Sequence, residues 1–291
     1  FFDPSVHKWQ DDSAVASTLD VIAMPIRKQD TAPLLFELRD QVAWLTFNRP
    51  AALNSVNPAM LVELHHALDR ILADEDARCV VLTGAGDAFC SGSDLGVVGA
   101  LAGPGHEEQV DAFIADVNGL LNRIEQLPLP VIAAVNGTAV GAGLEFALCT
   151  DLIVARADAR IGDGHARYGL LPGGGASVRL PRRIGTAAAK WLSFTGDLLP
   201  AEQLAACGLV QRVYPAAVFA AEVERLASRI ASRSPLGLRR VKALIDNAMR
   251  VTVEQALAEE QRQLKLHRSS WDRAEGLTAF AEKRTPRFRG M

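Results

Sequence analysis

Two glycine-rich stretches of the sequence can bind an anion through their backbone. They are GAGDAFCSGSD (84–94) and NGTAVGAGLE (136–145). Each follows an apolar run of strand character, so each can present free N–H groups at the carboxyl end of a sheet, where paired N–H donors stabilise the negative charge that develops on a carbonyl oxygen. A helix predicted to begin near Gly141 adds its dipole and its first unpaired amides.

Glu145 is the acidic residue closest to this predicted anion site. It lies three residues after Ala142, on the same helix face and within one turn. A carboxylate in that position can do acid–base chemistry on a bound carbonyl compound. The same pattern also fits a purely structural role, in which the glycines serve turns and close packing and Glu145 is a first-turn acid favoured by the helix dipole. Spacing alone leaves both interpretations open.

Other chemistry finds little support in the sequence. Neither glycine-rich stretch completes the dinucleotide-binding pattern G-x-G-x-x-G, because Phe89 and Phe146 occupy the last position. A Walker phosphate loop and a G-x-S-x-G nucleophile elbow are both missing. The four cysteines are widely spaced and in part lie in apolar surroundings, which predicts reduced structural thiols and no metal site.

The elements that must position these residues alternate between strands and helices. Apolar runs predict strands at 42–47, 79–83, 131–135 and 152–155, and helical periodicity follows Asn57-Pro58 and covers 109–124. After Leu171 the pattern is mainly helical, at 186–194, 200–207, 217–232, 235–249 and 252–267, with one strand candidate near 209–213. Strands separated by helices predict an α/β core with crossover connections, followed by a helical C-terminal region.

Domain organisation and location follow from the same pattern. We expect a poorly ordered N-terminal arm at 1–33, a core at 34–195 and a helical region at 196–291. The net charge of −3 argues against a nucleic-acid partner. No apolar run approaches the roughly 20 residues that span a membrane, so we expect no membrane association and a cytoplasmic protein.

Several motifs, taken in order, resemble the crotonase (enoyl-CoA hydratase/isomerase) superfamily. They are NRP (48–50), GDAFCSGSDL (86–95), NGTAVGAGLE (136–145), GLLPGGG (169–175), TGD (195–197) and AFAEKR (279–284). The resemblance runs from about Phe36 to the C-terminus. It implies a spiral of β-β-α turns, a helical trimerisation region and an acyl-CoA thioester substrate. It also implies a homotrimer or a dimer of trimers and no metal or redox cofactor, coenzyme A being part of the substrate.

The resemblance also assigns site residues. It places the oxyanion hole at the backbone N–H groups of Ser91 and Ala142, and the first catalytic glutamate of the hydratases at Glu145. At the position where hydratases carry their second glutamate, this sequence has a histidine, His165. The remaining substrate-binding residues that we infer are Asp94, Gly141, Phe280 and Lys283, the last two in a C-terminal segment that can reach an acyl-CoA site, in some relatives across a subunit boundary.

His165 leaves the reaction open. Hydration needs one group to orient and deprotonate water and another to protonate Cα, and histidine can do either near neutral pH. With histidine in this role we expect activity to fall on the acid side, with an apparent pKa of roughly 6–7. The leading prediction is a 2-enoyl-CoA hydratase that stabilises a thioester enolate. The alternatives are an isomerase, a decarboxylase, a C–C hydrolase, and a catalytically degenerate trimeric binding module.

Overall fold

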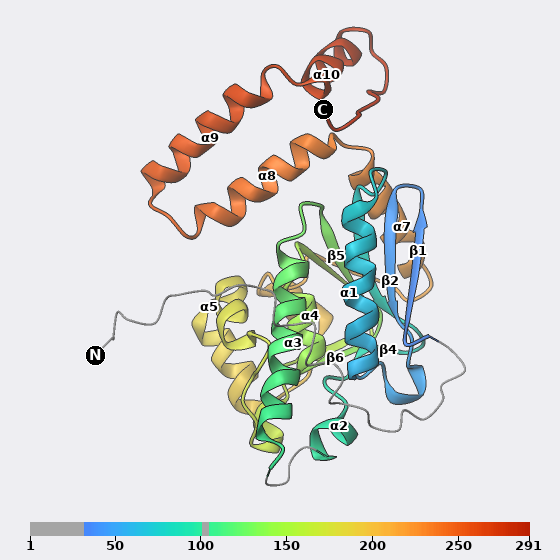
Figure 1. Cartoon of the computed structure of the whole chain (residues 1–291), viewed down its shortest axis with the longest axis vertical. Coiled ribbons are helices and arrows are strands. Elements are labelled where there is room, and N and C mark those ends of the chain that lie inside the picture. The colour runs from blue at the N-terminus through green and yellow to red at the C-terminus, as the bar shows by residue number, and fades with distance from the viewer. Residues whose placement is uncertain (1–31, 101–104) are drawn as a thin grey trace. The chain divides into compact units, whose positions relative to one another are not determined.

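The computed structural model describes residues 32–100 and 105–291 (Figure 1). The N-terminal arm predicted for 1–33 therefore lies almost entirely outside the described residues. Among the described residues, no helix combines the length and apolarity needed to cross a bilayer.

A six-stranded sheet forms the centre of the fold. Its strands, in spatial order, are β1 (Leu34–Arg39), β2 (Val42–Phe47), β3 (Cys79–Gly84), β5 (Val131–Val135), β7 (Leu152–Arg156) and β10 (Arg212–Tyr214). β1 and β2 are antiparallel, and every other neighbouring pair is parallel. The four strands predicted before residue 156 are confirmed. The strand expected near 209–213 forms at 212–214, slightly later than its apolar residues suggested.

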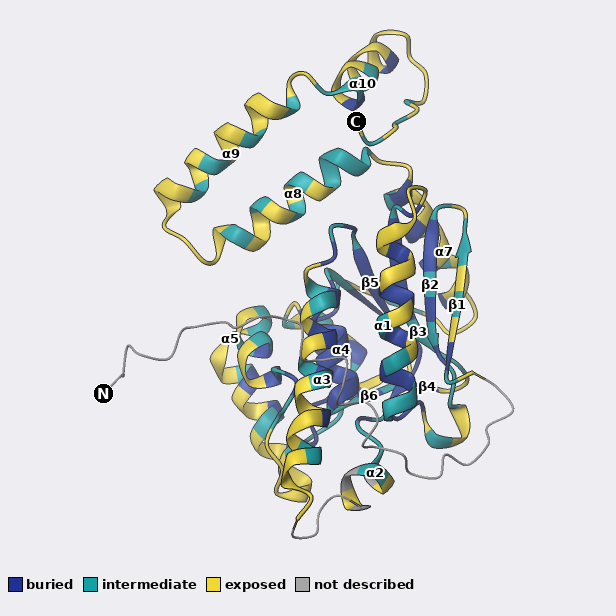
Figure 2. Ribbon diagram, in the orientation of Figure 1, coloured by how far each residue is buried: buried dark blue, intermediate teal, exposed yellow. Residues whose placement is uncertain are grey.

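Helices cover both faces of this sheet, which explains why its strands are continuously apolar. Alternate residues of β3 separate into two cores: Val80 and Leu82 pack in one, and Cys79 and Val81 in the other. The first core includes α1 (Pro58–Ala73) and α3 (Glu107–Glu125). The second is closed by α7 (Phe219–Ala231), and Figure 2 shows the buried strands between these layers.

A second, four-stranded sheet consists of strands only two or three residues long. Its order is β4 (Ala88–Cys90), β6 (Thr138–Val140), β8 (Arg160–Gly162) and β9 (Leu199–Pro200). β4, β6 and β8 are parallel to one another. The pairs β3/β4, β5/β6 and β7/β8 each give one strand to the large sheet and the next to the small one. This repetition is the predicted spiral of β-β-α turns.

Helices follow the small strands. They are α2 (Leu95–Ala100) after β4, α4 (Ala142–Leu148) after β6, and the 3-10 helix η4 (His165–Tyr168) with α5 (Ala176–Thr195) after β8. α5 contains a kink at Gly185, where φ is 78° and ψ is 161°. Its second half is the helix predicted at 186–194. Its first half was missed because Pro181 and Gly185 interrupt the apolar period.

The C-terminal region is helical, as predicted. It contains α6 (Ala201–Ala206), α7, α8 (Pro235–Ala248), α9 (Val253–His267) and α10 (Trp271–Ala281). One further 3-10 helix, η3 (Pro50–Ala52), follows β2. α8 and α9 pack against each other and contain no fully buried residue, so their apolar side chains stay largely in solvent (Figure 2).

Candidate active site

The carboxyl ends of β4, β6 and β8 meet at one edge of the small sheet because the three strands are parallel neighbours. Each end continues into a segment singled out in the sequence: Ser91–Asp94, Gly141 with α4, and Asp163–His165. A cavity of about 370 Å³ opens there, and it brings Glu145 and His165 together. Its other lining residues include Ser91, Ser93, Ala142, Asp163 and Arg167, and the apolar side chains Val110, Phe113, Ile114, Val117, Leu170 and Leu171.

Glu145 is almost completely buried, with 2% of its surface exposed. Burial raises the pKa of its carboxyl group, because the charged form loses its hydration. Its Oε1 accepts backbone N–H groups from Gly174, at 2.8 Å, and from Ala176, at 3.1 Å. These two donors support the carboxylate form against the effect of burial. The pKa of Glu145 is therefore raised by burial, while these hydrogen bonds oppose the shift.

In the loop above Glu145, a side chain at position 174 would displace the carboxyl group of Glu145. A Cβ built there would lie 2.5 Å from Oε2 of Glu145. Arg179 fixes this loop from α5, donating from Nη1 to the Gly174 carbonyl at 2.8 Å and from Nη2 to Glu125 at 2.9 Å. Its guanidinium is therefore used inside the fold.

His165 begins η4, and its Nδ1 is hydrogen-bonded to Oδ1 of Asp163. Asp163 is 1% exposed. The hydrogen bond to Asp163 raises the pKa of the imidazole, partial burial opposes the shift, and the negative charges of Asp163 and Glu145 add to it. His165 therefore carries a proton more readily than an ordinary histidine. Asp163 was missed in the sequence, although an acid two residues before a histidine at the end of a strand is a signal that could have found it.

The backbone N–H of Ser91 is not free, so the prediction that it forms the oxyanion hole is wrong. It donates to the Leu53 carbonyl at 3.0 Å. The next backbone contacts of this loop are with Val56. The Val56 N–H donates to the Gly92 carbonyl at 2.8 Å, and the Val56 carbonyl accepts the Asp94 N–H at 2.8 Å. The N–H of Ser93 lies between these two hydrogen-bonded groups in the chain. No acceptor takes it among the residues that the structure describes.

The position of Ala142 is compatible with the oxyanion role expected of it, and that role stays a prediction. It is the first residue of α4, and its N–H has no acceptor within the described part of the chain. The segment that holds Ser93 runs next to it, since a Cβ added at Gly92 would lie 3.8 Å from the Ala142 nitrogen. Ser93 and Ala142 both line the cavity. Their two N–H groups can hold an oxyanion beside Glu145.

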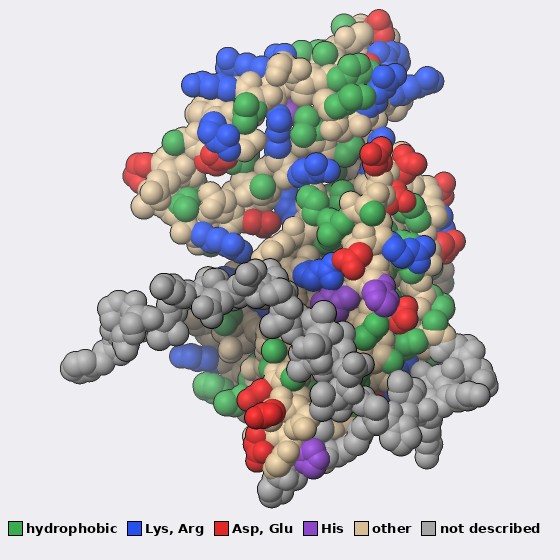
Figure 3. Space-filling model, viewed as in Figure 1, with side chains coloured by type: hydrophobic (Ala, Val, Ile, Leu, Met, Phe, Trp, Pro, Cys, Tyr) green, Lys and Arg blue, Asp and Glu red, His purple; other side chains and the backbone are tan. Residues whose placement is uncertain are grey.

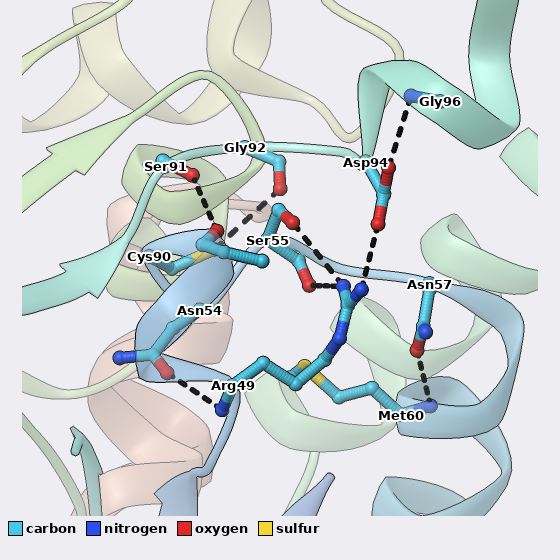
Figure 4. A network of polar contacts seen from close by, with 11 residues as sticks. Arg49, Asn54, Ser55, Asn57, Met60, Cys90, Ser91, Gly92, Asp94 and Gly96 are labelled. Carbon is cyan, nitrogen blue, oxygen red and sulfur yellow. Dashed lines mark hydrogen bonds and ion pairs between the residues drawn. The ribbon is translucent and has the colours of Figure 1, made fainter. Parts of the chain in front are cut away.

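Gly141 and Asp94 support the site mainly through contacts within the chain. Gly141 lines the cavity and donates its N–H to the Asp163 carbonyl at 3.0 Å. Asp94 accepts from Arg49 at 2.8 Å and from the Gly96 N–H at 2.9 Å, and Arg49 also donates to Ser55 (Figure 4). This network fixes the loop that carries Ser93. Asp94 is not among the residues that line the cavity, so the geometry does not support direct contact with substrate.

Phe280 and Lys283 are not brought to this cavity. Phe280 is 85% exposed on α10, Lys283 follows that helix, and no residue beyond Leu198 lines the cavity within the described ranges. Their predicted contact with substrate would need a neighbouring subunit. In the same described ranges, no group of three or more His, Cys, Asp or Glu side chains is arranged to hold a metal ion.

Comparison with known proteins gives one consistent result. A family model for enoyl-CoA hydratase/isomerase matches residues 37–291. The chain is 35% identical over 258 residues to the 2,3-dehydroadipyl-CoA hydratase of Escherichia coli, covering 88% of this chain and 98% of that protein. It is 36% identical over 260 residues to the 1,2-epoxyphenylacetyl-CoA isomerase of the same organism, covering 88% and 98%.

Solved structures agree with the sequence comparison. A crystal structure of an enoyl-CoA hydratase from Bacillus anthracis superposes with a TM-score of 0.85 at 36% identity, covering 89% of this chain and all of the other. The range matched by the family model, 37–291, includes Glu145 and the whole small sheet. On these grounds the chain belongs to the enoyl-CoA hydratase/isomerase family, the crotonase superfamily.

Proposed function

We propose that this protein is a 2-enoyl-CoA hydratase that works through a thioester enolate. The observation that carries the proposal is the cavity in which Glu145 and His165 lie together beside two free backbone N–H groups. Hydration of an enoyl thioester needs these parts: one group to deprotonate water, one to protonate Cα, and donors for the enolate oxygen.

The donors act on the thioester carbonyl. Ser93 and Ala142 direct their N–H groups to its oxygen, which becomes negative as water adds to Cβ. Because these donors are fixed by the backbone and need no reorganisation, they favour the enolate over the ground state. The dipole of α4, which begins at Ala142, acts in the same direction.

The two side chains divide the proton transfers. Glu145, with a raised pKa but two N–H donors on Oε1, takes the proton of the attacking water. His165, which holds its proton through Asp163, gives it to Cα of the enolate. Transfer of the proton from Glu145 to His165 then restores the starting state. One water is consumed, and no redox step is needed.

The acyl chain lies along α3. Val110, Phe113 and Val117 form an apolar wall of the cavity, and Leu170 closes it from the loop after η4. A cavity of about 370 Å³ has room for a short or medium acyl group beside the reacting atoms.

The decisive assay offers crotonyl-CoA and a panel of other 2-enoyl-CoA thioesters to the purified protein. We expect loss of the ultraviolet absorbance of the conjugated double bond, together with a product heavier by one water. Glu145→Gln is expected to lower kcat by roughly 10²–10⁴-fold. The matched control is Glu63→Gln, which changes an exposed glutamate of α1 and should leave activity unchanged.

Isomerisation of the acyl-CoA double bond is the second candidate. The description of the matching family model, enoyl-CoA hydratase/isomerase, includes this reaction, and among the described residues Glu145 is the only glutamate that lines the cavity. In the same assay an isomerase would move the double bond without a change of mass. A protein that changes no thioester of the panel would contradict both proposals and favour the degenerate binding module.

Assembly and the C-terminal segment belong to the same proposal. We infer a homotrimer or a dimer of trimers in the cytoplasm, without a bound cofactor. Exposed Lys and Arg side chains gather over α9, α10 and the C-terminal segment (Figure 3). In a trimer, Lys283 and Phe280 of this basic region would approach the phosphates and acyl or adenine group of a substrate bound in the next subunit.

A further inference from the structure

Asp163 is a buried carboxylate with one strong partner. It lies directly after β8 and is 1% exposed. Its Oδ1 is bonded to Nδ1 of His165. Its Oδ2 is buried without a hydrogen bond of normal geometry among the described residues, although Ser193 from α5 lies close enough to lower the pKa of the carboxyl group. A charge buried in this way is costly unless a partner compensates it.

We propose that Asp163 is a positioning residue that holds the imidazole of His165 with Nδ1 protonated and Nε2 directed to the substrate. The kinetic test of this proposal rests on the proposed function, whereas the test by NMR does not. The proposal goes beyond that function because it assigns the orientation and tautomer of His165 to a residue that touches no reacting atom.

The geometry leaves His165 little other freedom. Its carbonyl accepts the Leu170 N–H at 3.1 Å, and Arg167 donates its N–H to the Gly164 carbonyl at 3.2 Å, so the backbone of η4 is fixed on both sides. With Nδ1 taken by Asp163, only Nε2 remains to exchange a proton in the cavity. The Asp163 carbonyl accepts the Gly141 N–H at 3.0 Å. This bond fixes the backbone of Asp163, the partner of the imidazole, next to the start of α4 and the Ala142 N–H.

The charges around the ring support the same state. Glu145 approaches from α4, and Arg167 and Tyr168 follow His165 on η4 and also line the cavity. α5 packs against η4 and contributes the neutral Ser193 on the side of Asp163. Arg167 is paired with Asp197 at 3.8 Å. The two carboxylates nearest the ring, Asp163 and Glu145, therefore determine its proton affinity, and Asp163 has the larger effect.

Histidine NMR tests the proposal without any substrate. In protein labelled with ¹⁵N at histidine, the signal lost in His165→Gln identifies His165. We expect its neutral form to be the tautomer with Nδ1 protonated. We also expect Asp163→Asn, which keeps the size and an acceptor oxygen but removes the charge, to lower the midpoint of its titration. A neutral form protonated at Nε2, or an unchanged midpoint in Asp163→Asn, would overturn the proposal.

Kinetics test the same residue through its effect on catalysis. Asp163→Asn is expected to lower kcat by roughly 10–100-fold with little change in KM, as for other residues that orient a catalytic histidine or metal ligand. In a His165→Gln background the same change should have no further effect, because Asp163 acts only through His165. Asp158→Asn, five residues earlier and paired with Arg156 on the surface, is the matched control and should leave kcat unchanged.

The outcomes separate this proposal from the proposed function. Independent losses in the double variant would show that Asp163 has a merely structural role, which overturns the proposal. A wild type without hydratase or isomerase activity contradicts the proposed function alone, and the tautomer and titration of His165 then decide about Asp163. Should Asp163→Asn fail to fold, the tautomer in the wild type decides.

Discussion

At the scale of single residues, the site depends on what raises and what lowers the pKa values of Glu145 and His165. Burial raises the pKa of Glu145, while the N–H groups of Gly174 and Ala176 favour its charged form. His165 gains proton affinity from Asp163. The proposed mechanism uses Glu145 as a carboxylate and His165 as an imidazolium. This is the state that hydration requires of a base and an acid in one cavity.

The pH profile follows from these directions. Activity requires Glu145 ionised, so it falls as the pH drops through a pKa raised above 4.5. It requires His165 protonated, so it also falls as the pH rises through a pKa raised above 6.5. The limb that belongs to histidine is therefore the alkaline one, opposite to the expectation from the sequence. A profile of kcat in Asp163→Asn should lose activity at lower pH on that limb, and a histidine limb on the acid side would contradict these roles.

Sequence reasoning reached some of these residues and missed others for a physical reason. The placement of Glu145, His165 and Ala142 at the cavity could be predicted, because each belongs to a motif that follows a strand. Their chemical roles stay predictions. As oxyanion donors, Ser93 and Ser91 could not be distinguished from the sequence. The choice depends on which backbone N–H groups of this loop donate to the carbonyls of Leu53 and Val56. These hydrogen-bond partners are distant in the sequence, so no local sequence pattern predicts them.

At the scale of elements, α4 contains both Glu145 and the proposed oxyanion donor Ala142. Every residue of this helix is buried, so its position is fixed by packing on all sides. Phe146 meets Phe47 with ring centroids 5.2 Å apart, and Phe47 meets Phe89 of β4 at 5.5 Å. This aromatic group joins the helix behind Glu145 to the strand that leads to Ser93.

Replacing Ala142 by proline tests the oxyanion donor at the start of α4. Proline is tolerated at the first position of a helix but has no N–H to donate. We expect kcat to fall by roughly 10²–10³-fold with the fold retained in circular dichroism. Ala142→Ser keeps the N–H and serves as the control, and Ser91→Ala should stay within a few-fold of the wild type. Equally small effects of all three changes would remove this donor from the mechanism.

The contact between α4 and β4 gives a prediction about stability. A Cβ at Gly143 would lie 2.0 Å from the Cys90 carbonyl oxygen, a contact of backbone with backbone that cannot relax locally. Gly143→Ala is expected to destabilise the fold by about 1–3 kcal/mol, measured as the free energy of unfolding in urea. Gly119→Ala in α3, where no atom lies within 4 Å, should instead be neutral or stabilising. Similar stability of the two variants would contradict the packing described.

The large sheet was more predictable than the small one. Runs such as Val131–Val135 are apolar on both faces and long enough to be recognised. β4, β6 and β8 contain three residues each, and their pairing with one another is non-local, so no periodicity identifies them. The small sheet could therefore not be predicted from the sequence, although the loops at its edge were predicted.

At the scale of the whole molecule, the C-terminal helices present apolar side chains to solvent. Val241 and Ile245 on α8 form a stripe at four-residue spacing with Met249, which follows the helix. Ile245 is 63% exposed and Met249 79%. Leu257 and Leu264 continue the exposure on α9. Patches of this kind mark association surfaces.

Light scattering at micromolar concentration checks the inferred assembly. We expect the mass of a trimer or a dimer of trimers, and we expect Ile245→Arg to weaken it, because a buried interface does not accept an unpaired charge. Arg250→Glu changes an exposed charge next to the stripe and distinguishes the loss of an apolar contact from a general change of charge. A wild-type monomer would contradict the inference.

The cysteines have a consequence for labelling chemistry. Burial raises the pKa of Cys79, Cys90 and Cys149 to about 12, so almost no thiolate is present at neutral pH. Cys207, the residue that ends α6, is only half-buried. A maleimide dye should therefore attach at a single position in the native protein and at all four thiols after denaturation. The wild-type chain thus supplies its own site for a fluorophore, and energy transfer between labelled copies could report on subunit exchange without any engineered cysteine.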